Sequence, residues 1–354
     1  MAARGRRGGV SGFFSGLASL LMIALTIVLV GAFIFIAETS RAGPATQETI
    51  VEIERGAGAS AIGHTLEREG VVRNALVFRL ASEAFARGKH LKAGEYAIPE
   101  GASVRDVVTM IADGRAVQHA VTIPEGYTIA AALRVIADAD FLTGDMPEPP
   151  AEGSILPETY YVQRGATRAE VLQQMIDAHD EAVTEIWEGR DENLPVRTPE
   201  EMVILASIVE RETGVAEERP MVAAAFTNRL RRGMRLESDP TIIYGVCKQL
   251  PQRCRNGRLI NERTGAIRTI RESEIAMDTG YNTYQIDRLP PTPIANPGRA
   301  SMEAVTHPAD SNVIFFVADG SGGHAFAETN AEHEANVRAW RRIEAERLAE
   351  EARN

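Results

Sequence analysis

The sequence predicts an α+β protein with a single N-terminal transmembrane helix, a small β-α-α-β module and a larger mixed α+β domain. Three observations carry this prediction. Residues 13–37 form an uncharged, mostly apolar run, and a strand–helix–helix–strand pattern follows between Thr49 and Ile98. Several longer helical patterns then begin after Glu152, which is the pattern of helices and strands segregated along one chain.

The length and charge of the chain restrict the classes of protein to which it can belong. The chain has 354 residues, of which 44% are hydrophobic and 25% charged, so it can bury a sizeable core. Its length permits about two to three domains. The formal net charge of −11 argues against nucleic acid as a partner, because phosphate binding needs a basic surface.

The N-terminus predicts a membrane anchor. Arg4, Arg6 and Arg7 precede the apolar run 13–37, and about 20 apolar residues suffice for a helix to cross a bilayer. The positive-inside rule places residues 1–12 in the cytoplasm and the remaining chain outside the inner (cytoplasmic) membrane, in the periplasm. A cleaved signal peptide is the alternative, but its apolar core is usually about 7–15 residues, which favours a retained anchor.

The next segment, residues 48–150, contains the small module and a partial repeat of it. Thr49–Ile53 reads as a strand, helical stretches run to Glu69 and from Ala75 to Arg87, and Ala93–Ile98 reads as a returning strand.

The partial repeat lies 70 residues further along the chain. Val51-x-Ile53-x-x-Gly56 aligns with Val121-x-Ile123-x-x-Gly126, and an alanine-rich helical stretch follows each glycine. Two related strand–turn–helix halves are one interpretation, and chance recurrence of a common pattern is the other. Prolines in Met146–Pro150 mark a loop or linker after the second half.

The larger domain is predicted over residues 151–340, and the charged end of a terminal helix over 341–354. Two apolar strands flank Asp319–Gly323, whose glycines favour a hairpin turn; this turn lacks the lysine and following helix of a phosphate-binding loop. The helices predicted in this domain are 168–188, 199–213 and 218–232, followed at the C-terminus by 332–353.

One of these helices ends in a candidate general acid. Thr198 and Glu201 match a capping box, Pro199 suits the first helical position, and Gly214 is expected to stop the helix. Glu212 then lies in the last turn of an apolar helix, near the negative end of the helix dipole. Both surroundings disfavour a charged carboxylate and raise its pKa, as a general acid requires.

Glu210 competes with Glu212 for that role. The two residues lie about 200° apart on the helix, so they cannot both face one cleft. Periodicity does not choose between them. For either glutamate, a cap or a salt bridge with Arg211, Arg219 or Arg229 is the structural alternative.

Two cysteines occur, Cys247 and Cys254. In an exported protein such neighbours can form a disulfide, and two free thiols are the alternative. Two thiols without a neighbouring histidine pair do not complete a metal site, and the seven histidines show no ligand spacing. No metal site is therefore expected.

The order of motifs closely resembles the endolytic murein transglycosylase (YceG-like) family across nearly the whole chain. The segment Ala206–Gly214 carries the strongest part of the resemblance. Further matching motifs are Leu156–Tyr160, Glu218–Pro220, Phe226–Leu230, Gly233–Leu236, Asp239–Gly245, Tyr281–Tyr284, Leu289–Pro291, Pro297–Gly298, His307–Pro308 and Val317–His324.

The resemblance implies both an activity and a site. It identifies the catalytic glutamate as the one directly before Thr or Ser, here Glu212, and identifies the first module as LysM-like. It implies an enzyme, a lyase that cuts peptidoglycan glycan strands internally, leaves 1,6-anhydro-N-acetylmuramic acid ends and needs no metal or organic cofactor. Glycan polymerases (penicillin-binding proteins) are the implied protein partners. The expected substrate-binding residues are Tyr281, Asn282, Tyr284, Asn228, Asp239 and Tyr244.

Two features depart from the family pattern. Glu237 stands where many members carry an amide, and Cys247–Cys254 is a local elaboration. Two other functions stay open from the sequence: a non-catalytic scaffold that binds peptidoglycan, and a hydrolytic muramidase that uses the same acid with water as the nucleophile.

Overall fold

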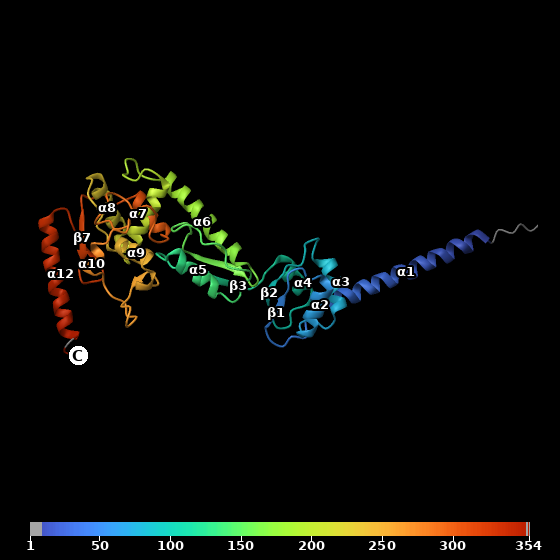
Figure 1. The fold of residues 1–354 in the computed structure, drawn as a ribbon. Helices are drawn as coiled ribbons and strands as arrows, with labels where there is room; N and C mark the ends of the chain where they lie inside the picture. The colour runs from blue at the N-terminus through green and yellow to red at the C-terminus, as the bar shows by residue number, and fades with distance from the viewer. Residues whose placement is uncertain (1–8, 352, 354) are drawn as a thin grey trace, which may run out of the picture. The chain divides into compact units, whose positions relative to one another are not determined.

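The computed structural model of the protein describes residues 9–351 and 353, and it divides into two compact units (Figure 1). The first unit runs to residue 119 and includes 163–165; the second consists of 120–162 and the chain from 166 onward. Helices and four two-stranded sheets make up the part of the chain that the structure describes. The predicted α+β class is therefore confirmed.

The first unit begins with the long helix α1, Gly9–Ser40 (Figure 1). Its stretch Ala18–Ser40 has a mean hydropathy of 3.0, and the apolar 18-residue window within it is not buried inside the protein. By length and composition this helix qualifies to cross a membrane, as would a signal sequence at the same place. The predicted cytoplasmic arginines, Arg4, Arg6 and Arg7, lie outside the described residues.

The rest of the first unit has the predicted β-α-α-β order, followed by a further helix. The two strands pair antiparallel with Thr49 opposite Ile98, and their inward residues Val51, Tyr96 and Ile98 join the unit's apolar core. A complete capping box between Ser103 and Asp106 starts the further helix. The elements are β1 Thr49–Ile53, α2 Ala59–Arg68, α3 Ala75–Phe85, β2 Gly94–Ile98 and α4 Val104–Asp113.

Each copy of the predicted repeat forms a strand, a glycine turn and a helix. Gly56 and Gly126 both have positive φ, at 83° and 73°, which glycine adopts without steric cost. Val121 and Ile123, like Val51 and Ile53, are buried. The two compact units separate near residue 120, because the second copy packs with α6 in another core, which contains Ile136, Val162 and Met175.

The second unit is built around helix α7, Pro199–Glu212, whose residues from Met202 to Val209 are all buried. It packs against α6, α8, α9 and α11 (Figure 1). The remaining elements of this unit are β3 Gln118–Thr122, α5 Ile129–Asp138, β4 Thr159–Gln163, α6 Arg168–Glu188, α8 Arg219–Arg231, α9 Asp239–Gln249, β5 Cys254–Arg255, β6 Arg258–Leu259, α10 Glu272–Ile275, α11 Arg299–Thr306, β7 Phe315–Ala318, β8 His324–Ala327 and α12 Asn330–Glu351, with short 3-10 turns at Ala216–Glu218 and Pro251–Arg253.

The predicted C-terminal hairpin is confirmed. Strands β7 and β8 pair antiparallel with Ala318 opposite His324, and the turn between them contains Gly320 and Gly322 with positive φ. The charged helix α12 packs against both strands, so it covers the hairpin as well as facing solvent.

Candidate functional site

Helix α7 ends at Glu212, because Thr213 and not the predicted Gly214 is the first residue to leave the helix. Thr198 caps the start by accepting a hydrogen bond from the Glu201 backbone, as predicted. The Glu201 carboxylate instead accepts from the Arg197 backbone, so the capping box is only half formed. At the other end Thr213 leaves the helix in an extended conformation, and its hydroxyl accepts from the Val215 backbone at 3.0 Å. Glu212 is therefore the last helical residue.

Glu212 is partly buried in surroundings that favour its neutral form. Burial raises its pKa to about 7, and the negative charge of Asp239 acts in the same direction. The Ser238 hydroxyl donates a 2.9 Å hydrogen bond to its Oε2, and this bond and the Arg229 charge oppose the rise only in part. A carboxyl group with this pKa is half protonated at neutral pH, which suits a group that first donates and then accepts a proton.

Glu210 has different surroundings, although it lies only two residues away. Its side chain is 5% exposed and forms an ion pair with Arg219 at 3.3 Å. The Gly298 backbone and the Ser301 hydroxyl both donate to its Oε2, at 3.1 and 2.8 Å. Three donors of this kind stabilise the charged form of a carboxylate. Glu210 therefore ties α7 to the N-terminus of α11.

A second set of bonds holds the chain that follows Glu212. The Thr213 hydroxyl donates to Glu218 at 3.3 Å. The Glu218 carboxylate also accepts from the His324 backbone at 2.8 Å and contacts its Nδ1 at 2.7 Å. Burial raises the pKa of Glu218, but the bonds from His324 outweigh it and leave the pKa below its usual value. These contacts connect the helix end to the start of β8.

The buried side chain of Arg229 connects the backbone segments that precede α9 and β7. Its guanidinium donates to the backbone oxygens of Ile314 and Leu236, and to the Glu237 carboxylate at 2.9 Å. Glu237 adopts a φ of 54°, in the left-handed region, and its side chain remains 47% exposed. Glu237, which differs from the amide expected in the family, thus forms a partly exposed ion pair with Arg229.

The predicted substrate-binding residues fall into three pairs. Tyr284 and Asp239 lie beside Glu212: the Tyr284 hydroxyl donates to Asp239 at 2.9 Å, and Asp239 is the first residue of α9, directly after Ser238. Asn282 and Asn228 are buried, and each donates its side-chain amide to two backbone oxygens. Their contacts favour an architectural role.

Tyr281 and Tyr244 form an aromatic pair with ring centroids 4.9 Å apart. Lys248 donates to the Tyr281 hydroxyl at 2.7 Å and lies over its ring, with Nζ 4.7 Å from the centroid. The Tyr244 hydroxyl donates to Glu152 at 3.3 Å. Tyr281 is buried, so Tyr244 is the member of the pair that reaches the neighbouring cleft.

That cleft has a volume of about 890 Å³ and lies entirely within the second unit. One face of α9 lines it with Pro240, Ile243, Tyr244, Cys247 and Lys248, whose spacing is that of one helical stripe. Glu212 and Asp239 are not among the lining residues, but their chain neighbours Arg211 and Pro240 are. The Glu212 side chain therefore lies outside the lining of this cleft, and its chain neighbour Arg211 is the α7 residue that lines it.

Ser238 and Glu152 are site residues that the sequence reasoning missed. A serine before Asp-Pro at a helix start is ordinarily read as an N-cap, and Ser238 does occupy the N-cap of α9. Its hydroxyl, however, is directed to Glu212 instead of to a backbone N–H. Nothing in the local sequence distinguishes these two uses.

The two cysteines are bonded to each other in the structure. Among the residues that the structure describes, no group of three or more His, Cys, Asp or Glu side chains gathers closely enough to hold a metal ion. The candidate site is thus made of one partly buried glutamate, its hydrogen-bonding neighbours and the adjacent cleft.

Comparison with known proteins decides the family. The sequence model of the YceG-like family matches residues 51–339, which is most of the chain. The protein belongs to the YceG-like family. The matched range of this YceG-like chain includes the candidate site residues Glu212, Ser238, Glu218 and His324.

Two relatives called endolytic murein transglycosylase share about a quarter of their aligned residues with this chain. The endolytic murein transglycosylase of Streptococcus pneumoniae (strain D39) is 27% identical over 335 residues, and the match covers 81% of this chain but 57% of that protein. The endolytic murein transglycosylase of Bacillus subtilis (strain 168) is 24% identical, with 80% and 82% covered. The YceG-like chain thus spans little more than half the length of the streptococcal relative.

A solved structure supports the fold. The crystal structure of a yceG-like protein from Listeria monocytogenes superposes with a TM-score of 0.50 at 25% identity, covering 82% of this chain and 99% of that one.

Proposed function

We propose that this protein is a membrane-anchored lytic transglycosylase that cuts glycan strands of peptidoglycan internally and so ends their elongation. The observation that carries the proposal is the position of Glu212: it is held by Ser238 at the end of α7, with a pKa of about 7. Membership of the YceG-like family and the names of the relatives support the same reaction.

One titrating carboxyl group is sufficient for this reaction. Neutral Glu212 donates its proton to the glycosidic oxygen between N-acetylmuramic acid and N-acetylglucosamine, and that bond breaks. The 2-acetamido group of the muramic acid stabilises the positive charge that develops. The Glu212 carboxylate then takes the proton of the C6 hydroxyl, whose oxygen bonds to C1 and closes the 1,6-anhydro ring. No water is consumed, and Glu212 ends protonated as it began.

The surrounding residues have supporting roles in the proposed mechanism. Ser238 orients the carboxyl group by donating to Oε2 and so leaves Oε1 for the proton transfers. Asp239, held by Tyr284, raises the proton affinity of Glu212 and adds negative charge near the developing cation. Tyr244 offers an aromatic face at the cleft for a sugar ring.

Digestion of purified peptidoglycan with the full-length protein in detergent tests the proposal. We expect products with 1,6-anhydro ends, one water lighter than the reducing ends of hydrolysis. Glu212→Gln should abolish them, whereas the matched change at the exposed Glu217 should not. Reducing ends would instead indicate a hydrolytic muramidase with a water nucleophile, for which a second carboxylate is usually required.

Unchanged glycan that nevertheless retains the protein in a pull-down would indicate the third possibility, a scaffold. The β-α-α-β module in the first unit favours glycan binding if it is LysM-like, as the sequence resemblance implies. Binding by Glu212→Gln protein with loss of cleavage is the result that supports both a binding module and a catalytic unit.

The proposed location is the inner membrane, with a cytoplasmic N-terminus and the second unit in the periplasm. The apolar helix α1 supports this proposal. The proposal requires that α1 stays attached to the mature protein. N-terminal sequencing of the membrane-bound protein tests it: a new N-terminus near residue 42 would show cleavage instead. Association with glycan polymerases is implied by the family resemblance alone and stays a prediction.

A further inference from the structure

The cleft lined by Arg211 and Tyr244 is markedly basic, although the whole chain has a formal net charge of −11. Five cationic side chains line it against two carboxylates, Asp138 and Glu152. Within the described part of the chain, none of the five forms an ion pair with a carboxylate. These cations are Arg134, Arg211, Lys248, Arg255 and Arg258.

The hydrogen bonds of these cations go to neutral groups. Arg211 donates to the Gly126 backbone oxygen at 3.3 Å, Arg255 to that of Gly265 at 2.9 Å, and Lys248 to the Tyr281 hydroxyl. Burial, and then the charge of Arg258, lower the pKa of Arg211. The charge of Arg258 thus disfavours that of Arg211, and the negative charge of Glu210 opposes this effect.

The two carboxylates do not neutralise this charge. Glu152 accepts from the Ile129 backbone at 2.8 Å and from Tyr244, and burial raises its pKa despite these bonds. Asp138 is the last residue of α5 and is exposed. The positively charged side chains of the cleft thus outnumber its carboxylates, five to two.

A short hairpin presents two of the arginines. Arg255 and Arg258 are directly opposite each other in the β5–β6 pair, and Asn256 and Gly257 form the turn between them with φ values of 53° and 70°. Directly opposed residues project from the same face of an antiparallel pair, and like charges there destabilise it. A bound anion between them would remove that cost.

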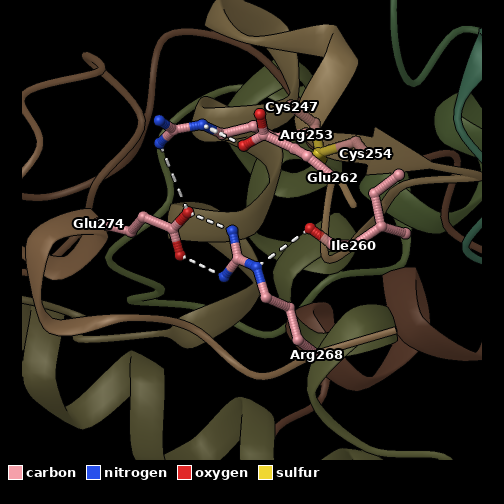
Figure 2. Close-up of a disulfide and its surroundings, with 7 residues drawn as sticks. All are labelled: Cys247, Arg253, Cys254, Ile260, Glu262, Arg268 and Glu274. Carbon is pink, nitrogen blue, oxygen red and sulfur yellow. Dashed lines mark hydrogen bonds and ion pairs between the residues drawn. A yellow bond between two sulfur atoms is a disulfide. The ribbon is translucent and has the colours of Figure 1, made fainter. Parts of the chain in front are cut away.

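The hairpin belongs to a braced segment, which we define as residues 247–275. Figure 2 shows the Cys247–Cys254 disulfide at its start and the buried Glu274 between two arginines. Arg268 binds Glu274 with two hydrogen bonds, at 2.8 and 2.6 Å, and also donates to the Ile260 backbone oxygen. The bracing fixes the wall of the cleft that carries Arg255 and Arg258.

We propose that this cleft binds a carboxylate of the stem peptide attached to the muramic acid, with Arg255 and Arg258 as its principal ligands. The inference rests on the proposed function. Stem peptides carry several carboxylates, whereas the sugars of an intact peptide-bearing strand are uncharged. Arginine binds a carboxylate through two parallel hydrogen bonds. Because Arg211 lines the cleft next to Glu212, a stem peptide there would hold its muramic acid near the acid.

The test compares two substrates that differ only in charge: soluble uncrosslinked strands, and the same strands after their carboxylates are converted to primary amides. For the full-length protein in detergent we expect KM to rise about tenfold on amidation, with little change in kcat. Equal KM values for the two substrates, with anhydro products from both, would overturn the inference alone. Absence of anhydro products from both would overturn the proposed function.

The Arg255→Gln/Arg258→Gln protein should show the same rise in KM on untreated strands and no further rise on amidated ones. Arg263→Gln is the matched control, since Arg263 is an exposed arginine of the same segment that does not line the cleft. Equal effects of the control and the double variant would contradict the assignment. As a competitor, free stem peptide should inhibit cleavage; inhibition by inorganic pyrophosphate only would show that the cleft takes a phosphate group instead.

Discussion

Replacing Glu212 by glutamine is expected to stabilise the second unit at alkaline pH while it abolishes the proposed cleavage. The folded protein holds the pKa of Glu212 at about 7, against an ordinary value of 4.5, chiefly because the side chain is buried. Each unit of difference corresponds to about 1.4 kcal/mol, so the charged form costs the folded state about 3 kcal/mol. Glutamine keeps the size of the side chain and an oxygen that can accept from Ser238, but it carries no charge.

The sign and the pH range follow from the raised pKa. Below about pH 4.5 the carboxyl group is neutral in both the folded and unfolded states, and the substitution changes little. Between about pH 4.5 and 7, Glu212 loses its proton in the unfolded chain but keeps it in the folded protein. The free energy of unfolding of the wild type therefore falls through this range. The advantage of Glu212→Gln should therefore grow through this range and level off at about 3 kcal/mol above pH 7.

Thermal unfolding followed by tryptophan fluorescence is a suitable assay, because Trp187 and Trp340 both lie in the second unit. For a unit of about 230 residues, 3 kcal/mol corresponds to about 6–12 °C in Tm. We expect this increase at pH 8 and almost none at pH 4.5. A Tm that falls at both pH values would refute the reasoning, since it would mean that the fold stabilises the charged carboxylate.

Glu210→Gln is the matched comparison on the same helix. Its carboxylate accepts from Gly298 and Ser301 and pairs with Arg219, so the amide should weaken all three contacts. Breaking a buried pair costs about 3 kcal/mol or more, so Glu210→Gln should lower Tm. The two substitutions are thus expected to change Tm in opposite directions.

Three further predictions concern activity and the braced segment. The kcat/KM of cleavage should fall about tenfold per pH unit above about pH 7, as Glu212 loses its proton, and a flat profile from pH 6 to 9 would exclude it as the acid. Cys247→Ser/Cys254→Ser should lower the stability of the segment by about 2.5 kcal/mol by the loop-entropy argument, measured as faster hydrogen exchange there with the tryptophan transition unchanged. Glu274→Gln should cost about 3 kcal/mol because it removes the fully buried carboxylate that pairs with the partly buried Arg268, and Arg268→Met added to it should recover part of the loss in a urea titration.

Much of the fold could be predicted because its signals are local. Thr167 and Glu170 form the complete capping box that starts α6, and the helix has the predicted bounds Arg168–Glu188. The strand Thr49–Ile53 alternates between buried and exposed residues near its end, as a half-buried strand does. The end of α7 differs from the predicted stop at Gly214, since Thr213 already leaves the helix in an extended conformation that its own contacts hold.

The candidate site depends on contacts that no local pattern contains. The distinction between Glu210 and Glu212 rests on Ser301, which follows Glu210 by 91 residues, and on Ser238, which follows Glu212 by 26. Helical periodicity says that the two glutamates face apart, but it does not say what each one faces. The basic cleft is similarly non-local, because Arg134 and Arg258 come from α5 and β6.

The two glutamates also explain how one helix end can be both firmly held and chemically responsive. Glu210 meets the N-terminus of α11, where a backbone N–H and the positive end of the helix dipole favour its charge. Glu212 faces the start of α9, but Ser238 offers it a hydroxyl and Asp239 a negative charge, so its proton stays bound to higher pH. The contacts of Glu210 fix the last turn of α7, and a fixed last turn keeps Glu212 at a constant place against Ser238. Loss of activity in Glu210 variants is therefore expected through lost stability, and in Glu212 variants through the lost proton.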